Sequence, residues 1–349
     1  MRRICFNSKK PIDCRVQLFR NPERGVERCV AVVTRSEHEF GLGGTRSSKW
    51  PSDALMLEDC ILLAQGMKYK SLFHHLPYAG AKVCIELTPD ADPKEAYTAL
   101  GEFVAHDWHE LITTEDIGTS PSLMAIMHRV APDRILGRPI DDGGSGDPSP
   151  YTARGVWQSI KAAARHWFKR PDGDLTGLRI LVKGVGHVGA EVARLVLEDG
   201  ANLMVADINE KALDRFRDKP RCKVVAPTET PEVDIFCPCA KGGEVGENFN
   251  WPGVKAIVGA ANNQLTSDEV ANLLHQRGIL YLPDWAVNGG GLISVAAEHM
   301  KKSREWAMQR AMAIGQRMDE LLTESMKRHE VPLVVAYDLC DQPREVVTS

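Results

Sequence analysis

Two lysines and an aspartate are placed where they could carry out chemistry on a small molecule. Lys70 and Lys82 lie twelve residues apart in MKYKSLFHHLPYAGAK, and Asp116 follows in TEDIGTS. About a hundred residues further on, the motif GVGHVG indicates a binding site for a dinucleotide. One lysine could hold a carboxylate, the other could transfer protons, and a nicotinamide could take a hydride. Together these groups fit the oxidative deamination of an amino acid.

The glycine-rich motif has the surroundings of a dinucleotide-binding fingerprint. Gly184, Gly186 and Gly189 follow a predicted strand and open a predicted helix, and Asp207 ends the next strand. Such glycines allow a tight turn, a close approach of backbone to pyrophosphate, and close packing of helix on strand. A carboxylate at position 207 can bind ribose hydroxyls and repels a 2′-phosphate, so we predict NAD and not NADP. The alternative is an ordinary glycine turn followed by a surface aspartate.

Strand and helix patterns predict an α/β chain with two domains. Strands are predicted at 15–20, 28–34, 81–87 and 110–117, and helices at 52–69 and 93–108. GGSGDPSP at 143–150 is the candidate linker. A helix at 151–168 then leads into a βαβ pattern, with strands at 234–238, 256–261 and 279–283 that favour a parallel sheet, and a helical region from about 292 to 328.

These elements predict the domain boundaries. An N-terminal α/β domain at 1–145 would bind substrate and oligomerise, and a Rossmann NAD-binding domain would span 146–324. We expect an active-site cleft between them. A C-terminal segment of about 325–349 is predicted to return to the first domain.

Composition excludes several classes of function. The formal net charge of the 349 residues is −4, so no electrostatic nucleic-acid partner is expected. The N-terminus lacks the apolar core of a signal peptide, and no run of about 18 apolar residues predicts a membrane span. The nine cysteines are scattered, which favours free thiols in a reducing, cytoplasmic setting, and no metal site is predicted.

The chain resembles the leucine, phenylalanine, valine and tryptophan branch of the amino acid dehydrogenases, relatives of glutamate dehydrogenase. The resemblance covers roughly residues 28–345. It rests on motifs in the same order: GLGGTR (41–46), GMKYK (66–70), AGAK (79–82), TEDIGT (114–119), SGDPSPYTARGV (145–156), GVGHVG (184–189), DIFCPCAKGG (234–243), GAANNQL (259–265) and PDWAVNGGGLISV (283–295). It implies reversible, NAD-dependent conversion of an L-amino acid to a 2-oxo acid and ammonia by a homo-oligomer, dimer or higher.

The resemblance also implies roles for single residues. Lys70 would bind the substrate α-carboxylate, Lys82 would act as general base on the water that attacks the imine, and Asp116 would shuttle protons. Because Lys82 would have to lose its proton, we expect an alkaline optimum for deamination. The alternative is that both lysines are surface residues. Besides the glycines and Asp207, cofactor contacts are implied at Thr152, His187, Val188, Cys239, Ala240, Ala260, Asn262 and Asn288.

The substrate side chain is predicted to be apolar or aromatic. Glutamate dehydrogenases hold the distal carboxylate with a lysine and a serine, and this chain has Leu42 and Val295 at the matching positions. A carboxylate buried there would lack a partner, at a cost of several kcal/mol. The alternative is that these apolar residues are simply core. The predicted substrate contacts, besides Lys70, are Leu42, Gly43, Leu76, Asn288, Leu292 and Val295.

The chain departs from the family pattern before the second lysine. Ala79 and Ala81 replace glycines of the usual GGGK, and their methyl groups could narrow the backbone approach to substrate or be tolerated if φ stays negative. His74, His75 or Tyr78 could face the pocket, and Lys241 could bind a phosphate or point to solvent. Two alternatives therefore stay open: a relative acting on a non-standard amino acid or imine, and a non-catalytic NAD-binding regulatory protein.

Overall fold

The computed structural model describes residues 12–341, which form two compact units. The N-terminal unit comprises residues 12–148 together with residues 291–309. The C-terminal unit comprises residues 149–290 together with residues 310–341. Throughout residues 12–341, no helix has the length and apolar character that a membrane span requires.

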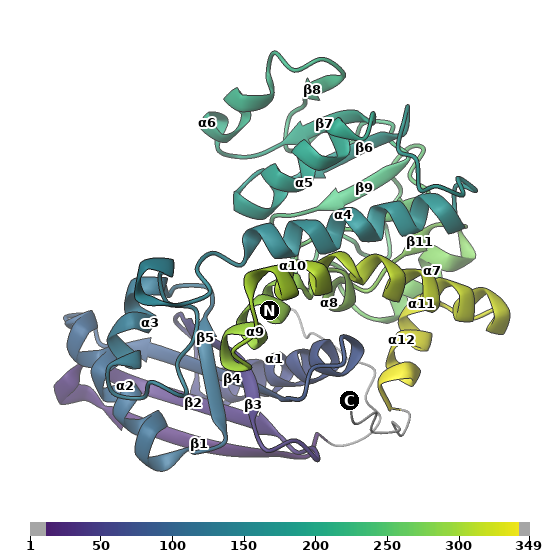
Figure 1. The fold of residues 1–349 in the computed structure, drawn as a ribbon. Helices are drawn as coiled ribbons and strands as arrows, with labels where there is room; N and C mark the ends of the chain where they lie inside the picture. Colours follow the sequence, from purple (N-terminus) through teal and green to yellow (C-terminus); the bar gives the residue numbers. More distant parts are fainter. Residues whose placement is uncertain (1–11, 342–349) are drawn as a thin grey trace. The chain divides into compact units, whose positions relative to one another are not determined.

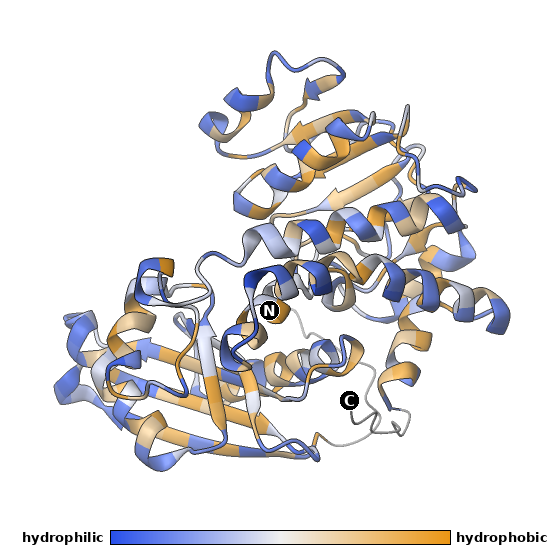
Figure 2. Cartoon of the chain, in the orientation of Figure 1, coloured by the Kyte–Doolittle hydropathy of each residue, from blue (hydrophilic) through white to orange (hydrophobic). Residues whose placement is uncertain are grey.

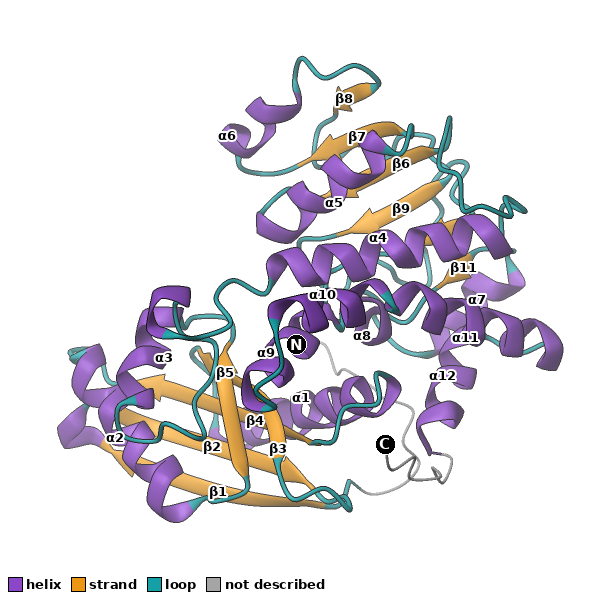
Figure 3. Ribbon diagram, viewed as in Figure 1, coloured by secondary structure: helices purple, strands orange, loops and turns teal. Residues whose placement is uncertain are grey.

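A mixed five-stranded sheet forms the centre of the N-terminal unit (Figure 1, Figure 3). Its order is β1 (Cys14–Asn21), β2 (Val26–Thr34), β4 (Ala79–Leu87), β3 (Gly41–Ser47) and β5 (Leu111–Glu115), with the 3-10 turn η1 (Pro22–Arg24) between β1 and β2. The first three strands are antiparallel neighbours, whereas β3 runs parallel to both β4 and β5. Thr45 of β3 pairs with Val83 on one side and with Glu115 on the other. The middle of β4 is therefore level with the end of β5.

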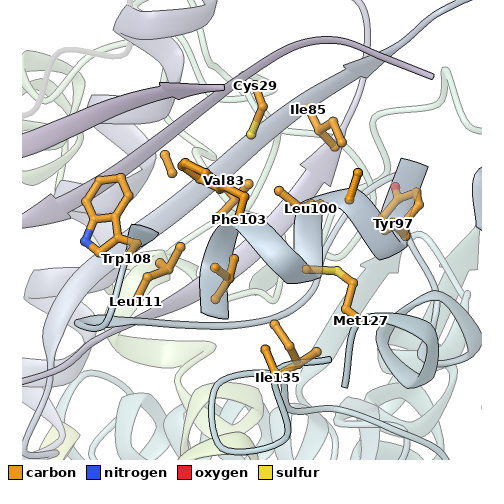
Figure 4. Close-up of a cluster of buried hydrophobic side chains, with 14 of the residues drawn as sticks. Cys29, Val83, Ile85, Tyr97, Leu100, Phe103, Trp108, Leu111, Met127 and Ile135 are labelled. Carbon is orange, nitrogen blue, oxygen red and sulfur yellow. The ribbon is translucent and has the colours of Figure 1, made fainter. Parts of the chain in front are cut away.

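Helices cover both faces of this sheet. On one face α1 (Asp53–Phe73) packs against alternate residues of β2 and β4, in a cluster of Val30, Val32, Met56, Cys60, Ala64 and Cys84. On the other face α2 (Pro93–Asp107) and α3 (Pro121–His128) cover a larger cluster (Figure 4), which includes Cys29, Val83, Ile85, Leu100, Phe103 and Met127. Since successive side chains of a strand point to opposite faces, both sides of β2 and β4 are apolar.

The strand β3 is absent from the sequence-based expectations. Its sequence, GLGGTRS, is rich in glycine and lacks the β-branched run that marks a strand. The extended conformation of β3 is stabilised instead by its neighbours, because β3 is hydrogen-bonded to β4 on one side and to β5 on the other. A Cβ atom at Gly43 would collide with the carbonyl oxygen of Ala81, so the close approach of β3 to β4 requires glycine there.

A six-stranded parallel sheet forms the centre of the C-terminal unit. Its order is β11 (Leu280–Tyr281), β10 (Ala256–Ile257), β9 (Ile235–Pro238), β6 (Arg179–Lys183), β7 (Asn202–Ala206) and β8 (Cys222–Val224). If β6 is counted as the first strand of this unit and the sheet is followed from β8 to β11, the order is the 3-2-1-4-5-6 order of a dinucleotide-binding Rossmann fold. Hydrophobic residues concentrate in the strands of each sheet, and hydrophilic residues in loops and outer helix faces (Figure 2).

The helices of the C-terminal unit follow the alternation expected of such a fold. They are α4 (Ser149–His166), α5 (His187–Glu198), α6 (Glu210–Leu213) with the 3-10 turn η3 (Asp214–Phe216), α7 (Glu269–Gln276), α8 (Asp284–Val287), α11 (Ile314–Arg328) and α12 (Pro332–Asp341). The predicted helical region from 292 to 328 is divided into α9 (Gly290–His299), α10 (Arg304–Met312) and α11. Lys301, between α9 and α10, has a positive φ of 54°, which ends the helical path.

The structure divides the chain differently from the predicted domains. The chain passes between the units after Pro148, inside the predicted linker, and not at residue 145. Residues 291–309 belong to the N-terminal unit, whereas residues 310–341 stay with the C-terminal unit. The reason is that α11 buries Ile314, Met318 and Leu321 and packs against α4. Residues 342–349 of the predicted returning segment lie outside the described residues.

Candidate functional site

Lys82 and Asp116 form an ion pair in the N-terminal unit. Lys82 lies in the middle of β4, and Asp116 directly follows β5. The Lys82 Nζ lies 2.7 Å from the Asp116 Oδ2, with 5% and 20% of the two side chains exposed. Gly44 of β3 lies between them, and a Cβ atom there would be 2.9 Å from the Asp116 Cβ. The glycine of the intervening strand therefore allows the two side chains to meet.

A third charged group, Arg46, holds the same carboxylate. Its Nε donates to the Asp116 Oδ2 over 2.9 Å, and its guanidinium lies 3.9 Å from Asp59. Burial alone would raise the pKa of Asp116, but the charges of Lys82 and Arg46 outweigh it and lower that pKa to about 2. Asp116 is therefore ionised at neutral and alkaline pH. In the sequence analysis Arg46 appears only within the motif GLGGTR, and its contact with Asp116 was not predicted.

The backbone around Asp116 is fixed by a tight turn. The Asp116 amide donates to the Thr119 hydroxyl over 2.8 Å, and that hydroxyl contacts the carbonyl oxygens of Asp116 and Thr45 at 2.9 and 3.1 Å. Gly118 has a φ of +80°, and a side chain there would also collide with the backbone of Ser47. The TEDIGT sequence thus specifies the position of the carboxylate.

The two alanines that replace family glycines lie on the far side of β4 from Lys82. Ala79 and Ala81 are buried in the cluster that faces α2 and α3. Gly80 faces the opposite way, toward α1, where a Cβ atom would collide with the backbone of Ala64 and Lys68. Lys82, two residues on from Gly80, shares its face. The two methyl groups therefore pack into the core, on the side of β4 away from Lys82.

Gly80→Ala is expected to lower the free energy of unfolding by about 3 kcal/mol or more. The colliding atoms are backbone atoms of α1 and cannot move without shifting the helix. Urea unfolding checks this result. The control is Gly246→Ala, where the nearest atoms to a new Cβ are 3.4 Å away. Equal stability of the two variants would contradict the close approach of α1 to β4.

The other predicted substrate residues of the N-terminal unit are all at least partly buried. Lys70 lies in the last turn of α1 and is half-buried. Leu42 shares a sheet face with Gly44, whose Cβ position is 3.5 Å from the Lys82 Nζ. Buried apolar positions are Leu42, Leu76, Leu292 and Val295, the last two on α9. His74 is buried against Phe73, whereas His75 is exposed with a φ of 53°.

The glycine-rich turn has the geometry of a phosphate-binding turn. Gly184 has a φ of +94°, and a Cβ there would lie 2.7 Å from the Ala240 nitrogen. Gly186 caps α5 and faces open space, so nothing within 4 Å obstructs an approaching phosphate. A Cβ at Gly189 would collide with the carbonyl oxygen of Gly184. His187 and Val188 form the first turn of α5, with His187 exposed.

Asp207 follows the end of β7 and is tied to the same turn. Its Oδ2 accepts from the Val185 amide over 2.7 Å, and its Oδ1 accepts from the Asn209 amide over 2.8 Å. A carboxylate has about four acceptor sites, so two bonds leave capacity for ribose hydroxyls. Beside the turn, Cys239 is half-buried and its Sγ lies 3.6 Å from that of Cys237, while Lys241 is exposed.

Asn262, Asn288 and Thr152 lie close together in the C-terminal unit. The Asn288 Nδ2 donates to the Ala260 carbonyl over 3.0 Å and to the Asn262 Oδ1 over 2.7 Å. The Asn288 Oδ1 is buried and has no hydrogen-bond partner among the described residues. A Cβ at Gly290 would lie 2.7 Å from the Thr152 amide, so α4 begins close to this cluster. An unpaired buried acceptor fits the carboxamide N–H of a nicotinamide.

The candidate residues thus form two groups, one in each unit. One holds a buried lysine–carboxylate pair that can move protons, with an arginine that keeps the carboxylate ionised. The other holds a glycine-rich turn at the start of a helix, a carboxylate bonded to that turn, and a buried unpaired amide oxygen. Within residues 12–341 no group of three or more potential ligand side chains is arranged for a metal ion.

Comparisons with known proteins identify a family of similar sequences and structures. Residues 203–334 match the family model described as Glutamate/Leucine/Phenylalanine/Valine dehydrogenase. Leucine dehydrogenase of Bacillus cereus is 38% identical, over 87% of this chain and 83% of the relative. Phenylalanine dehydrogenase of Bacillus thermotolerans is 33% identical, over 92% and 86%. The crystal structure of L-tryptophan dehydrogenase from Nostoc punctiforme superposes with a TM-score of 0.78, at 26% identity and 94% coverage of both chains.

Proposed function

Because the chain belongs to the glutamate, leucine, phenylalanine and valine dehydrogenase family, we propose that it oxidatively deaminates an apolar or aromatic L-amino acid with NAD. Its relatives make it an amino acid dehydrogenase, an oxidoreductase that acts on a CH–NH₂ group with a nicotinamide cofactor. The products are the 2-oxo acid and ammonia, and the reaction is reversible. The buried pair of Lys82 and Asp116, at 2.7 Å, is the observation that carries the proposal.

The residues of the N-terminal unit would handle the substrate and its protons. Lys70 would bind the α-carboxylate by charge. When bound, the nicotinamide would supply a hydride acceptor for the Cα hydrogen. Lys82, in its neutral form, would take a proton from the water that attacks the imine carbon, and Asp116 would pass protons between Lys82 and the departing amine. Arg46 would return Asp116 to its ionised form after each proton transfer, since it holds the same oxygen as Lys82.

The residues of the C-terminal unit would hold the cofactor. The amides at the start of α5 would bind the pyrophosphate, and Asp207 would bind the adenosine ribose. Asn288 would accept from the carboxamide, supported by Asn262, with Thr152 nearby. Ala240 and Cys239 would line the phosphate turn, and Ala260 would fix Asn288 through its carbonyl.

The substrate side chain is proposed to be apolar because the matching positions carry no charge. Leu42 and Val295 are 0% and 4% exposed, and a distal carboxylate placed against them would lose hydration without gaining a partner. Apolar pockets discriminate a methylene by only about 1–3 kcal/mol, so several aliphatic or aromatic substrates are expected to compete. We also propose a homo-oligomer, which size-exclusion chromatography with light scattering would test.

The experiment that tests the function is a substrate profile. Purified protein is mixed with NAD and each L-amino acid at alkaline pH, and NADH formation is followed by absorbance. Turnover of an apolar or aromatic amino acid, with little turnover of glutamate, is the expected result. Turnover of glutamate alone would overturn the substrate class, and turnover of none would overturn the proposed reaction for standard amino acids.

Asp207→Asn is expected to reduce the preference for NAD over NADP by about tenfold or more. The amide oxygen can still accept from the Val185 amide, so the turn is retained, while the charge that repels a 2′-phosphate is lost. Ratios of kcat/KM for the two cofactors measure the effect. The exposed Asp218, changed to Asn, is the control in the same unit. An unchanged ratio in the Asp207 variant would remove Asp207 from cofactor selection.

A further inference from the structure

An aromatic cluster joins the starts of β3 and β4 to the end of α9 in the N-terminal unit. The Tyr78 hydroxyl lies 2.7 Å from the His299 Nδ1, and the two ring centroids are 5.5 Å apart. Phe40 contacts His299 edge-on at 5.6 Å, and the Arg134 guanidinium lies over the Phe40 ring at 4.7 Å. Residues 40, 78 and 299 are thus brought together from distant parts of the chain.

The hydrogen bond in this cluster joins two neutral groups. Tyr78 is 2% exposed, and burial raises the pKa of its hydroxyl, which therefore keeps its proton. Burial also lowers the pKa of His299, and the positive charges of Arg134 and Lys301 act in the same direction, against Asp133. One proton is thus shared between an uncharged hydroxyl and an uncharged ring nitrogen. The bond is shielded from water on the tyrosine side, so competition from solvent is small.

The cluster is connected by short stretches of backbone to the proposed substrate residues. Tyr78 directly precedes β4, which carries Lys82, and Phe40 directly precedes β3, which carries Leu42. The Ala79 amide donates to the Phe40 carbonyl over 2.8 Å, which joins the two strand starts. His299 lies one helical turn after Val295 on α9.

A second contact holds the same end of α9. The Glu298 Oε2 accepts from the amides of Gly137 and Ser145 over 2.9 and 2.8 Å. These bonds tie α9 to the segment between α3 and α4, whereas the His299 bond ties it to the start of β4. Of these two sets of bonds, the His299 bond is the one that reaches the start of the strand that carries Lys82. It joins that strand to the helix one turn after Val295.

We propose that Tyr78 and His299 are positioning residues that fix the end of α9 on β4 and thereby set which substrate side chains are accepted. The inference rests on the proposed function and deepens it, since it names the contact that determines side-chain selectivity. Neither residue is assigned to the chemistry. Loss of the bond lets α9 shift relative to β4, so discrimination between small and large side chains falls, while the Lys82–Asp116 pair stays intact.

The test compares variants that remove or keep this one bond. Tyr78→Phe removes only the hydroxyl, His299→Leu removes the ring nitrogens, and His299→Asn keeps a polar atom close to the Nδ1 position. Tyr97→Phe is the matched control, because Tyr97 is equally buried but lies on α2, in the core cluster between that helix and the sheet. KM and kcat are measured for valine, leucine, phenylalanine and tryptophan. Urea unfolding is measured for the single variants and for the double variant Tyr78→Phe/His299→Leu.

We expect Tyr78→Phe and His299→Leu each to change the ratio of KM values for large and small substrates about fivefold, with kcat changed much less. His299→Asn should retain most of the wild-type ratio, and the double variant should resemble the singles in both ratio and unfolding. An unchanged ratio, or additive losses of stability, would overturn the inference. If the wild-type protein oxidises no amino acid, the proposed function fails, and the unfolding cycle alone still decides whether the two residues are coupled.

Discussion

Lys82→Met is expected to lower kcat for amino acid oxidation by about 10²–10⁴-fold while leaving cofactor affinity unchanged. The change removes the base but keeps a side chain of similar length in a position that is 4% exposed. Asp116 keeps its second cation, because the Arg46 Nε still donates to its Oδ2 over 2.9 Å. The variant should therefore fold, and its lower kcat should result from the missing base. Steady-state kinetics and titration of NADH fluorescence measure the two quantities.

The control for this variant is Lys49→Met, an exposed lysine that follows β3 in the same unit. It should match the wild-type protein in both measurements. If Lys82→Met kept more than about a tenth of the wild-type kcat, Lys82 would not be the general base. If it also lost affinity for NADH, the defect would be structural and not chemical, since the residues proposed to hold the cofactor belong to the C-terminal unit.

The arrangement of the proposed cofactor residues around the glycine-rich turn could be predicted from the sequence because its signals are local. Gly184, Gly186, Gly189 and Asp207 lie within a single βαβ unit, and the order of strand, turn, helix and strand specifies their positions. In the structure the glycines lie in and just after the turn between β6 and α5, and Asp207 is hydrogen-bonded to that turn. Asn288 and Asn262 could be brought into the site only through the family resemblance, because they follow different strands.

The contact between Lys82 and Asp116 depends on the pairing of strands, which sequence periodicity does not reveal. Lys82 and Asp116 meet across β3, a glycine-rich strand that the pattern of apolar residues does not mark. Without that strand, neither the role of Gly44 nor the contact of Arg46 with Asp116 could be inferred. For the same reason the sequence does not assign Ala79 and Ala81 to a face of the sheet, since only the packing of α1 against Gly80 defines the two sides of β4.

For the C-terminal helices, the sequence does not predict the unit to which each helix belongs. The sequence predicts that helices follow residue 292, but helical periodicity does not say which unit a helix packs on. α11 joins the C-terminal unit by burying an apolar stripe, whereas Glu298 and His299 hold α9 in the N-terminal unit through polar bonds. Such pairings are long-range and specific, so they become visible only in the structure.

Asp116→Asn is expected to lower both activity and stability, and the stability loss should depend on pH. The folded-state pKa of Asp116 is about 2, below its ordinary value of 3.8. A carboxyl whose pKa is depressed by folding contributes stability above its unfolded pKa and loses it as the pH falls through its folded pKa. The contribution is therefore complete above about pH 5 and disappears between about pH 4 and pH 2. Its size is about 2 kcal/mol, because each unit of pKa corresponds to about 1.4 kcal/mol.

The wild-type protein should thus exceed Asp116→Asn in free energy of unfolding by about 2 kcal/mol at pH 7, and the gap should narrow as the pH approaches 3. Urea unfolding across this range measures the gap, with Asp90→Asn as a control at an exposed position of the same unit. The kcat should fall about 10²–10⁴-fold, because an amide cannot relay protons from Lys82. A gap that stayed constant with pH would contradict the electrostatic origin of the stabilisation. A full loss of kcat with no stability gap would mean that Lys82 and Arg46 are held by contacts other than Asp116, and that the carboxylate serves the chemistry alone.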